Sequence, residues 1–275
     1  MRKKTTILAE GLAFPEGPRW REDQLWFSDM NRGLVMTVDE TGVLNTVLHV
    51  PGSPSGLGWL PDGRLLVVSM IDRRLLRLDA GGPVEVADLF DLASYHLNDM
   101  VVDDRGRAYI GNFGFDLTIP EPFSPAEIIM VEPDGTARVA AKDMAFPNGT
   151  VITPDGRTLI VAETFGRRLT AFTREEDGSL VDRRLWADVA PATPDGICLD
   201  RDDAIWVASP ETAEVVRVAP GGVITDRVEV STRPYACMLG GTDRRTLFVC
   251  TSGAGPFDGG RIEVVEVEVP GTGFP

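Results

Sequence analysis

The sequence predicts an all-β protein, and within that class a six-bladed β-propeller. Three observations support this prediction. A unit of strand and turn signals recurs six times along the chain. The 29 glycines and 20 prolines suit many short strands joined by turns, and little of the chain has the 3.6-residue apolar period of a helix. A β-sandwich shares such a strand pattern, but it does not require six similar copies.

Each repeat begins with a turn of small residues, followed by an apolar strand, a turn such as Pro-Asp-Gly, an alternating strand, and a charged hairpin that leads to another strand. Residues 54–79, 147–173 and 194–220 follow this order closely, and 15–39, 97–114 and 234–252 follow it more loosely. One residue in the first turn marks each copy: Glu16, Ser55, Asn98, Asn148, Asp195 and Tyr235. These markers lie 39 to 50 residues apart, a period typical of propeller blades with about four strands each.

A propeller must also close its ring, commonly by pairing strands from both chain ends within one blade. The segments KTTILAEG (4–11) and RIEVVEVEV (261–269) are suited to that pairing. No linker or low-complexity segment interrupts the series of repeats. The whole chain, residues 1–275, is therefore expected to form a single domain.

Composition limits the partners. The formal net charge is −15 and the pI is near 4.6, which disfavours nucleic acids and anionic membrane surfaces and favours neutral substrates and cations, metal ions included. The three cysteines lack the spacing of a disulfide framework or a zinc site. The basic N-terminus has too short an apolar stretch for a signal peptide, and no run reaches the length of a membrane span. A cytoplasmic protein, monomeric or a small homo-oligomer, is expected.

The markers also predict a metal site. Equivalent positions of the innermost strands face one another across the channel of a propeller, so Glu16, Asn98, Asn148 and Asp195 should converge on one axis. Two carboxylates and two amide carbonyls form a set of hard oxygen donors with a formal charge of −2. This set favours Ca²⁺, with Mg²⁺, Mn²⁺ or Zn²⁺ as alternatives. Turn chemistry alone accounts for any single marker, whereas four at matching phases favour one divalent ion.

Several motifs resemble a known family. FPEGPRW, LND before a strand, FPNG before a TPDG turn, TPDGICLD and RPYACMLGGTDRRTLFVCTS are similar to motifs of the senescence marker protein / gluconolactonase / luciferin-regenerating enzyme family, over essentially the whole chain. The resemblance implies a six-bladed propeller whose ion is held by Glu16, Asn148 and Asp195, with Asn98 either a fourth ligand or a substrate contact. Members mostly open lactones or related cyclic esters, and some relatives cleave organophosphates.

The predicted reaction is therefore metal-dependent hydrolysis of a small neutral lactone or ester. A divalent ion polarises the carbonyl and lowers the pKa of a bound water. Asp195 is the candidate general base, a role that the resemblance also implies, and Glu16 is expected to be a ligand only. The chain has no G-x-S-x-G, HExxH, P-loop or G-x-G-x-x-G signature, and its two histidines cannot form a His-rich metal site.

Candidate substrate contacts follow from position. His96 lies two residues before Asn98 and is either a substrate contact or proton carrier, or an exposed loop residue. Sugar-lactone members of the family often have arginine there. Phe113 and Phe115 (with Met70, Phe165 and Tyr235) either line an apolar entrance or pack between blades. An apolar entrance predicts a substrate less hydroxylated than gluconolactone.

Two other functions share this fold. A propeller of the strictosidine-synthase type would catalyse a non-hydrolytic condensation without a catalytic metal, and a binding propeller would hold a purely structural ion. A condensation without a catalytic metal has no need for the three converging oxygen ligands Glu16, Asn148 and Asp195, which argues against the strictosidine-synthase type. Measuring turnover with and without the ion distinguishes a binding propeller from an enzyme.

Overall fold

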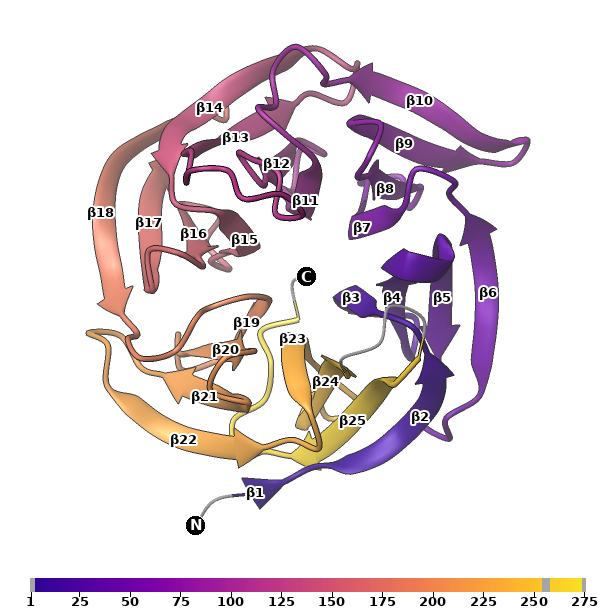
Figure 1. Cartoon of the computed structure of the whole chain (residues 1–275), viewed down its shortest axis with the longest axis vertical. Coiled ribbons are helices and arrows are strands. Elements are labelled where there is room, and N and C mark those ends of the chain that lie inside the picture. The colour runs from indigo at the N-terminus through magenta and orange to yellow at the C-terminus, as the bar shows by residue number, and fades with distance from the viewer. Residues whose placement is uncertain (1–2, 254–257, 274–275) are drawn as a thin grey trace.

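Six sheets, antiparallel except for one short parallel strand at an edge, surround one axis, which confirms the predicted six-bladed β-propeller (Figure 1). The computed structural model describes residues 3–253 and 258–273. One innermost strand of each blade lines the centre. These strands are β3 (Pro15–Arg21), β7 (Pro54–Trp59), β11 (Leu97–Val102), β15 (Pro147–Ile152), β19 (Ile197–Leu199) and β23 (Arg233–Gly240).

The remaining strands follow outward in chain order, except that the outer strand of the last blade comes from the start of the chain. The second strands are β4 (Gln24–Asp29), β8 (Leu65–Ser69), β12 (Ala108–Asn112), β16 (Thr158–Glu163), β20 (Ile205–Ser209) and β24 (Thr246–Ser252). The third strands are β5 (Leu34–Val38), β9 (Arg74–Asp79), β13 (Ala126–Val131), β17 (Arg168–Arg174), β21 (Glu214–Val218) and β25 (Gly260–Glu266). The outer strands are β6 (Leu44–His49), β10 (Gly82–Asp88), β14 (Ala137–Met144), β18 (Leu180–Asp188), β22 (Ile224–Glu229) and β2 (Thr6–Leu12).

The two ends of the chain meet in the last blade. Strand β2 runs antiparallel to β25 with Thr6 opposite Val264, so an N-terminal strand completes the sheet that β23, β24 and β25 begin. Strand β1 (Lys3–Lys4) extends the neighbouring blade by pairing in parallel with β22. The 3-10 helix η1 (Met30–Arg32) follows β4. In residues 3–253 and 258–273 no helix is long and apolar enough to cross a membrane.

The Pro-x-Gly segments that the sequence predicts as turns are the first residues of the inner strands β3, β7 and β15, and they recur for a packing reason. The pairing register shifts next to the marker residue, between Glu16 and Arg19 in β3 and between Pro147 and Thr150 in β15, as it does at a β-bulge. The glycine after the marker then faces the next blade. A Cβ on Gly17 would lie 2.8 Å from the Ser55 carbonyl oxygen, and one on Gly149 would lie 2.5 Å from the Ile197 nitrogen. Glycine therefore lets neighbouring inner strands approach closely around the axis.

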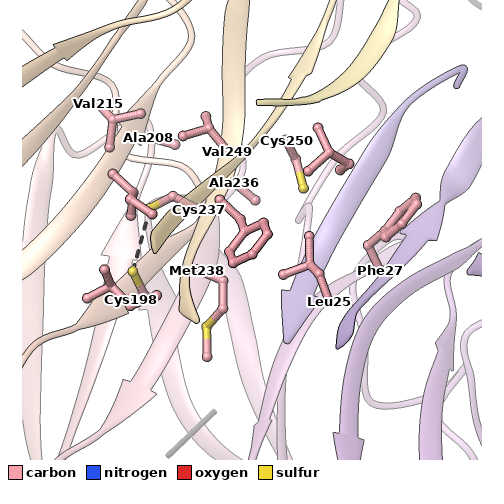
Figure 2. Close-up of a cluster of buried hydrophobic side chains, with 14 of the residues drawn as sticks. Leu25, Phe27, Cys198, Ala208, Val215, Ala236, Cys237, Met238, Val249 and Cys250 are labelled. Atoms are coloured by element: carbon pink, nitrogen blue, oxygen red, sulfur yellow. Dashed lines mark hydrogen bonds between the residues drawn. The ribbon is translucent and has the colours of Figure 1, made fainter. Parts of the chain in front are cut away.

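Apolar side chains fill the space between adjacent blades. Figure 2 shows one such cluster, in which Leu25 and Phe27 of β4 share a core with residues of the last two blades. The three cysteines are free and buried, and the sulfurs of Cys198 and Cys237 lie 3.9 Å apart. This packing holds the blades, and hence the inner strands, in a fixed arrangement.

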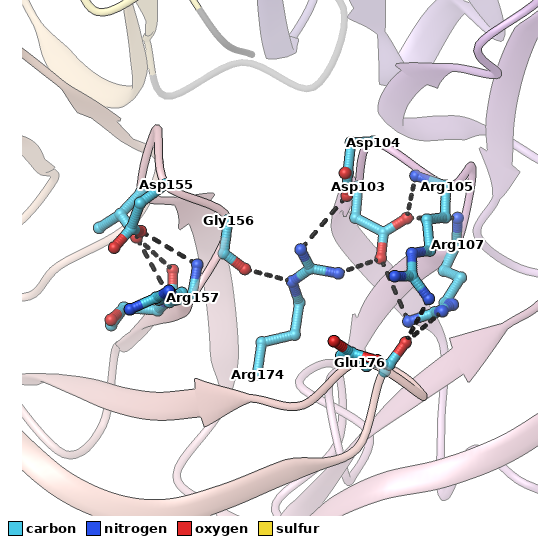
Figure 3. A network of polar contacts seen from close by, with 12 residues as sticks. Asp103, Asp104, Arg105, Arg107, Asp155, Gly156, Arg157, Arg174 and Glu176 are labelled. Carbon is cyan, nitrogen blue, oxygen red and sulfur yellow. Dashed lines mark hydrogen bonds and ion pairs between the residues drawn. The ribbon is translucent and has the colours of Figure 1, made fainter.

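A buried polar network joins the third blade to the fourth (Figure 3). Asp103, at the end of β11, accepts a 2.6 Å hydrogen bond from Arg174 on β17. Arg174 also donates to the Gly156 carbonyl at 2.6 Å, and Arg107 donates to the Glu176 carbonyl at 2.7 Å. The two blades that carry Asn98 and Asn148 are thereby fixed to each other at the ends of their inner strands.

Candidate active site

The four predicted oxygen-bearing side chains lie at the same end of the propeller. Glu16, Asn98 and Asn148 are each the second residue of an inner strand, and Asp195 comes just before β19. Asn98, Asn148 and Asp195 are buried, whereas Glu16 keeps some exposure. The inner strands surround one axis in Figure 1. Asp195 is close enough to Glu16 and Asn148 for both to shift its pKa, Glu16 by its charge and Asn148 by a side-chain hydrogen bond. The structure therefore brings these positions from separate blades together.

The backbone around the two carboxylates is fixed by hydrogen bonds. The buried Asp29 side chain accepts from the N–H groups of Ala13 and Phe14, at 3.0 and 2.8 Å, and so holds the segment that leads to Glu16. The Asp195 N–H donates to the Ala208 carbonyl at 3.0 Å. Both carboxylates thus sit on a preorganised main chain.

The two amide side chains are oriented by their nitrogens. Asn98 Nδ2 donates to the Pro147 carbonyl at 3.2 Å, and Asn148 Nδ2 donates to Thr164 Oγ1 at 3.4 Å. Thr164 Oγ1 in turn donates to the Pro194 carbonyl at 2.7 Å. Because the amide nitrogens are engaged, each Oδ1 is the atom left to bind a cation.

The carboxyl groups of the site are strongly perturbed. Burial, helped by the charge of Asp99, raises the pKa of Glu16 to about 8 against the opposing effects of the Gly17 N–H and Arg19. Burial also raises the pKa of Asp195 well above its usual range, with repulsion from Glu16 and Asp99 adding to the effect. A divalent cation would relieve this repulsion, and oxygen donors are what Ca²⁺ and Mg²⁺ prefer. The donor set therefore fits a hard divalent ion.

Amide oxygens are essential to that fit. Within the described part of the chain, no group of three or more His, Cys, Asp and Glu side chains is arranged to hold a metal ion. Two carboxylates with two asparagine oxygens are a weaker-field set, more typical of Ca²⁺ than of Zn²⁺.

Two charged residues near the site were missed in the sequence. Asp99 is buried next to Asn98 and forms a 2.9 Å ion pair with Arg19, which is also buried. The available signal was a break in the repeat: Asp99 occupies the position after the marker, where Gly17 and Gly149 stand in other blades. A buried acidic residue at a position that is glycine in other blades indicates that a basic side chain pairs with it, and Arg19 is that side chain.

The predicted aromatic contacts fall into two groups. Phe113 and Phe115 belong to one aromatic cluster with Phe146 and Phe165, and His96 lies 6.2 Å from the Phe113 ring centre. Tyr235 instead packs against Phe14 at 4.5 Å. Burial, with the nearby charge of Arg73, lowers the pKa of His96, so that His96 is neutral at pH 7.

Fold and site together define a six-bladed propeller that carries carboxyl and amide side chains of separate blades at the starts of its inner strands. The model of the SMP-30/Gluconolactonase/LRE-like region matches residues 14–253, so the chain belongs to this family.

Known relatives extend over most of the chain. The chain is 28% identical to a pentonolactonase of Haloferax volcanii, covering 90% of this chain and 85% of the relative. It is 27% identical to a 6-deoxy-6-sulfogluconolactonase of Pseudomonas putida, covering 86% and 82%. Among solved structures it resembles a calcium-binding regucalcin of Agrobacterium tumefaciens, with a TM-score of 0.83 at 22% identity over 100% of this chain and 98% of the other.

Proposed function

We propose that the protein is a divalent-metal-dependent lactonase. The observation that carries the proposal is the pairing of two mutually repelling carboxylates, the buried Asp195 and the partly exposed Glu16, with two asparagines whose amide nitrogens donate hydrogen bonds to the protein. The names of the two relatives, a pentonolactonase and a sulfogluconolactonase, support lactone hydrolysis as the activity. The calcium-binding neighbour makes Ca²⁺ the first ion to test.

Glu16, Asn148 and Asp195 would hold the ion, with Asn98 as a fourth ligand or as a contact to the substrate. When bound, the ion would supply Lewis-acid polarisation of the lactone carbonyl and a lower pKa for a coordinated water. The shared position of these residues at the starts of the inner strands explains how separate blades would deliver the ligands without long connecting loops.

Asp195 is the residue suited to move the proton. Its carboxylate would accept a proton from the attacking water as the new C–O bond forms. The same proton would then pass to the ring oxygen as the ester bond breaks, so that one lactone and one water yield one hydroxy acid. Glu16, held by the Gly17 N–H at 3.0 Å, would remain a ligand throughout.

The test is proton release in a pH-stat with a panel of lactones. Hydrolysis should be lost on chelation and restored by Ca²⁺. Asn148→Ala and Asp195→Asn should each lower kcat/KM at least about a hundredfold. The control variant is Glu211→Gln, which changes an exposed carboxylate on another loop and should keep full activity. Hydrolysis that persists in metal-free Asp195→Asn would overturn the proposal. An ion that raises the melting temperature without any turnover would indicate a structural ion instead.

A further inference from the structure

A continuous apolar surface adjoins the candidate active site. Five phenylalanines form it and are called here the aromatic wall: Phe113, Phe115, Phe123, Phe146 and Phe165. Neighbouring ring centres lie 4.9 to 6.2 Å apart. Every member lies in a connection of the third or fourth blade, at the end of the propeller where the inner strands begin.

Three features link the aromatic wall to the predicted ligands. Phe146 directly precedes Pro147 and Asn148 in β15. Phe165 follows Thr164, whose hydroxyl accepts the hydrogen bond from Asn148. On the other side, the Phe113 N–H donates to the His96 carbonyl at 2.9 Å, two residues before Asn98. The aromatic wall therefore begins within a residue or two of the asparagines.

The inner part of the aromatic wall is held rigidly. Phe146 is buried between Phe113 and Phe165, and it adopts a left-handed backbone with φ of 64°. This conformation is strained for a bulky residue and persists only where the surroundings impose it. The hydrogen bonds from the Thr164 N–H to the Phe146 carbonyl and from the Phe165 N–H to the Ala145 carbonyl, 3.1 and 3.2 Å, supply that constraint.

The outer part is left open. Phe165 and Phe123 are 51% and 52% exposed, and Leu117 and Ile119 of the same loop as Phe123 are also exposed. Two polar residues of that loop are paired with each other, because Asp116 accepts from the Thr118 N–H and hydroxyl at 2.8 and 2.6 Å. The surface thus offers apolar contact and few hydrogen bonds, which suits a hydrocarbon group and not a polyhydroxylated ring.

We infer that the substrate is a lactone bearing an aryl or alkyl substituent, which lies on the aromatic wall while the ester carbonyl reaches the axial site. This inference rests on the proposed lactonase function and narrows its substrate class. The lactone ring itself needs no hydroxyl groups. Burial of a phenyl group against Phe165 supplies the selectivity.

The experiment compares three five-membered lactones: γ-butyrolactone, its γ-phenyl derivative and the trihydroxylated ribono-1,4-lactone. The Ca²⁺-loaded protein should prefer the phenyl lactone over both others by kcat/KM. Phe165→Ala should lower kcat/KM for the phenyl lactone roughly ten- to fiftyfold, mainly through KM, and should lower it much less for γ-butyrolactone, which has no group to lie on the aromatic wall. Leu185→Ala, which removes a side chain 62% exposed on the outer strand β18, is the matched control and should change neither.

Binding provides a second measurement that is independent of turnover. Calorimetry with the non-hydrolysable 5-phenylpyrrolidin-2-one should show binding to the wild type that weakens in Phe165→Ala and in Phe123→Ala. Chelator-sensitive hydrolysis that favours ribono-1,4-lactone would overturn the substrate inference while leaving the lactonase function intact. If no lactone is hydrolysed but the phenyl lactam binds selectively, the proposed lactonase function is refuted and the aromatic wall is confirmed as a binding surface. No preference for the phenyl group in either assay would refute the inference.

Discussion

The buried ion pair between Arg19 and Asp99 should be a main support of the inner ring. It links β3 of the first blade to β11 of the third, although β7 lies between them in the blade order. The side chains are only 6% and 11% exposed. Arg19 also donates to the Pro18 carbonyl at 2.8 Å and to the Met100 carbonyl.

Arg19→Met keeps most of the side-chain volume and removes the charge. Asp99 would then stay buried without its cation, and its charge would add to the repulsion that it already exerts on Glu16 and Asp195. Breaking one side of a buried pair costs about 3–5 kcal/mol. For a chain of this size each kcal/mol lowers the melting temperature by about 2–4 °C, so we expect a fall of roughly 6–20 °C.

Urea unfolding in the presence of a chelator measures this effect. The double variant Arg19→Met/Asp99→Asn removes both charges and should recover part of the loss, so the coupling in a double-mutant cycle should be large. A saturating divalent ion should stabilise Arg19→Met more than the wild type, because it supplies positive charge to the same carboxylates. A loss below about 1 kcal/mol, the value of an exposed ion pair, or strictly additive variants, would refute the reasoning.

Three further results are expected. Because burial raises the pKa of Glu16 from 4.5 to about 8, the metal-free protein should lose stability as the pH rises between these two values. For the same reason, calorimetry in two buffers should show that Ca²⁺ binding releases the Glu16 proton at pH 6.5 and no longer releases it at pH 9. Gly149→Ala should destabilise the protein by about 1–3 kcal/mol in urea unfolding, since its Cβ would lie 2.5 Å from the Ile197 nitrogen; a neutral effect would mean that the inner strands are not tightly apposed. The three buried thiols should resist a thiol reagent in the native protein and react fully in urea; fast native labelling would contradict the blade packing.

The fold was predictable because a propeller repeats one supersecondary unit, so even weak local signals add up when they recur at one period. The same periodicity made Glu16 and Asn148 candidates, since one phase of the repeat points to one place in space. The periodicity could not reveal the pairing of Arg19 with Asp99, because these two residues occupy different positions of the repeat and belong to blades that are not adjacent. Their partnership depends on the distance between blades, which no local pattern encodes. The sequence grouped Phe165 with Phe113 and Phe115, but it missed Phe123 and Phe146 as ring partners of Phe165, because these contacts depend on how loops of different blades fold against one another.

The pairing of β2 with β25 has a consequence for synthesis of the protein. Strand β2 leaves the ribosome early, yet its partner residues 260–266 are among the last to be made. Until then the nascent chain carries an unsatisfied strand edge at its beginning and, once β24 has been made, another on that strand. Such edges are prone to pairing with other chains. Truncation before residue 260 should therefore produce an aggregating polypeptide, and a chaperone that shields β2 would be useful from the synthesis of that strand until β25 has been made.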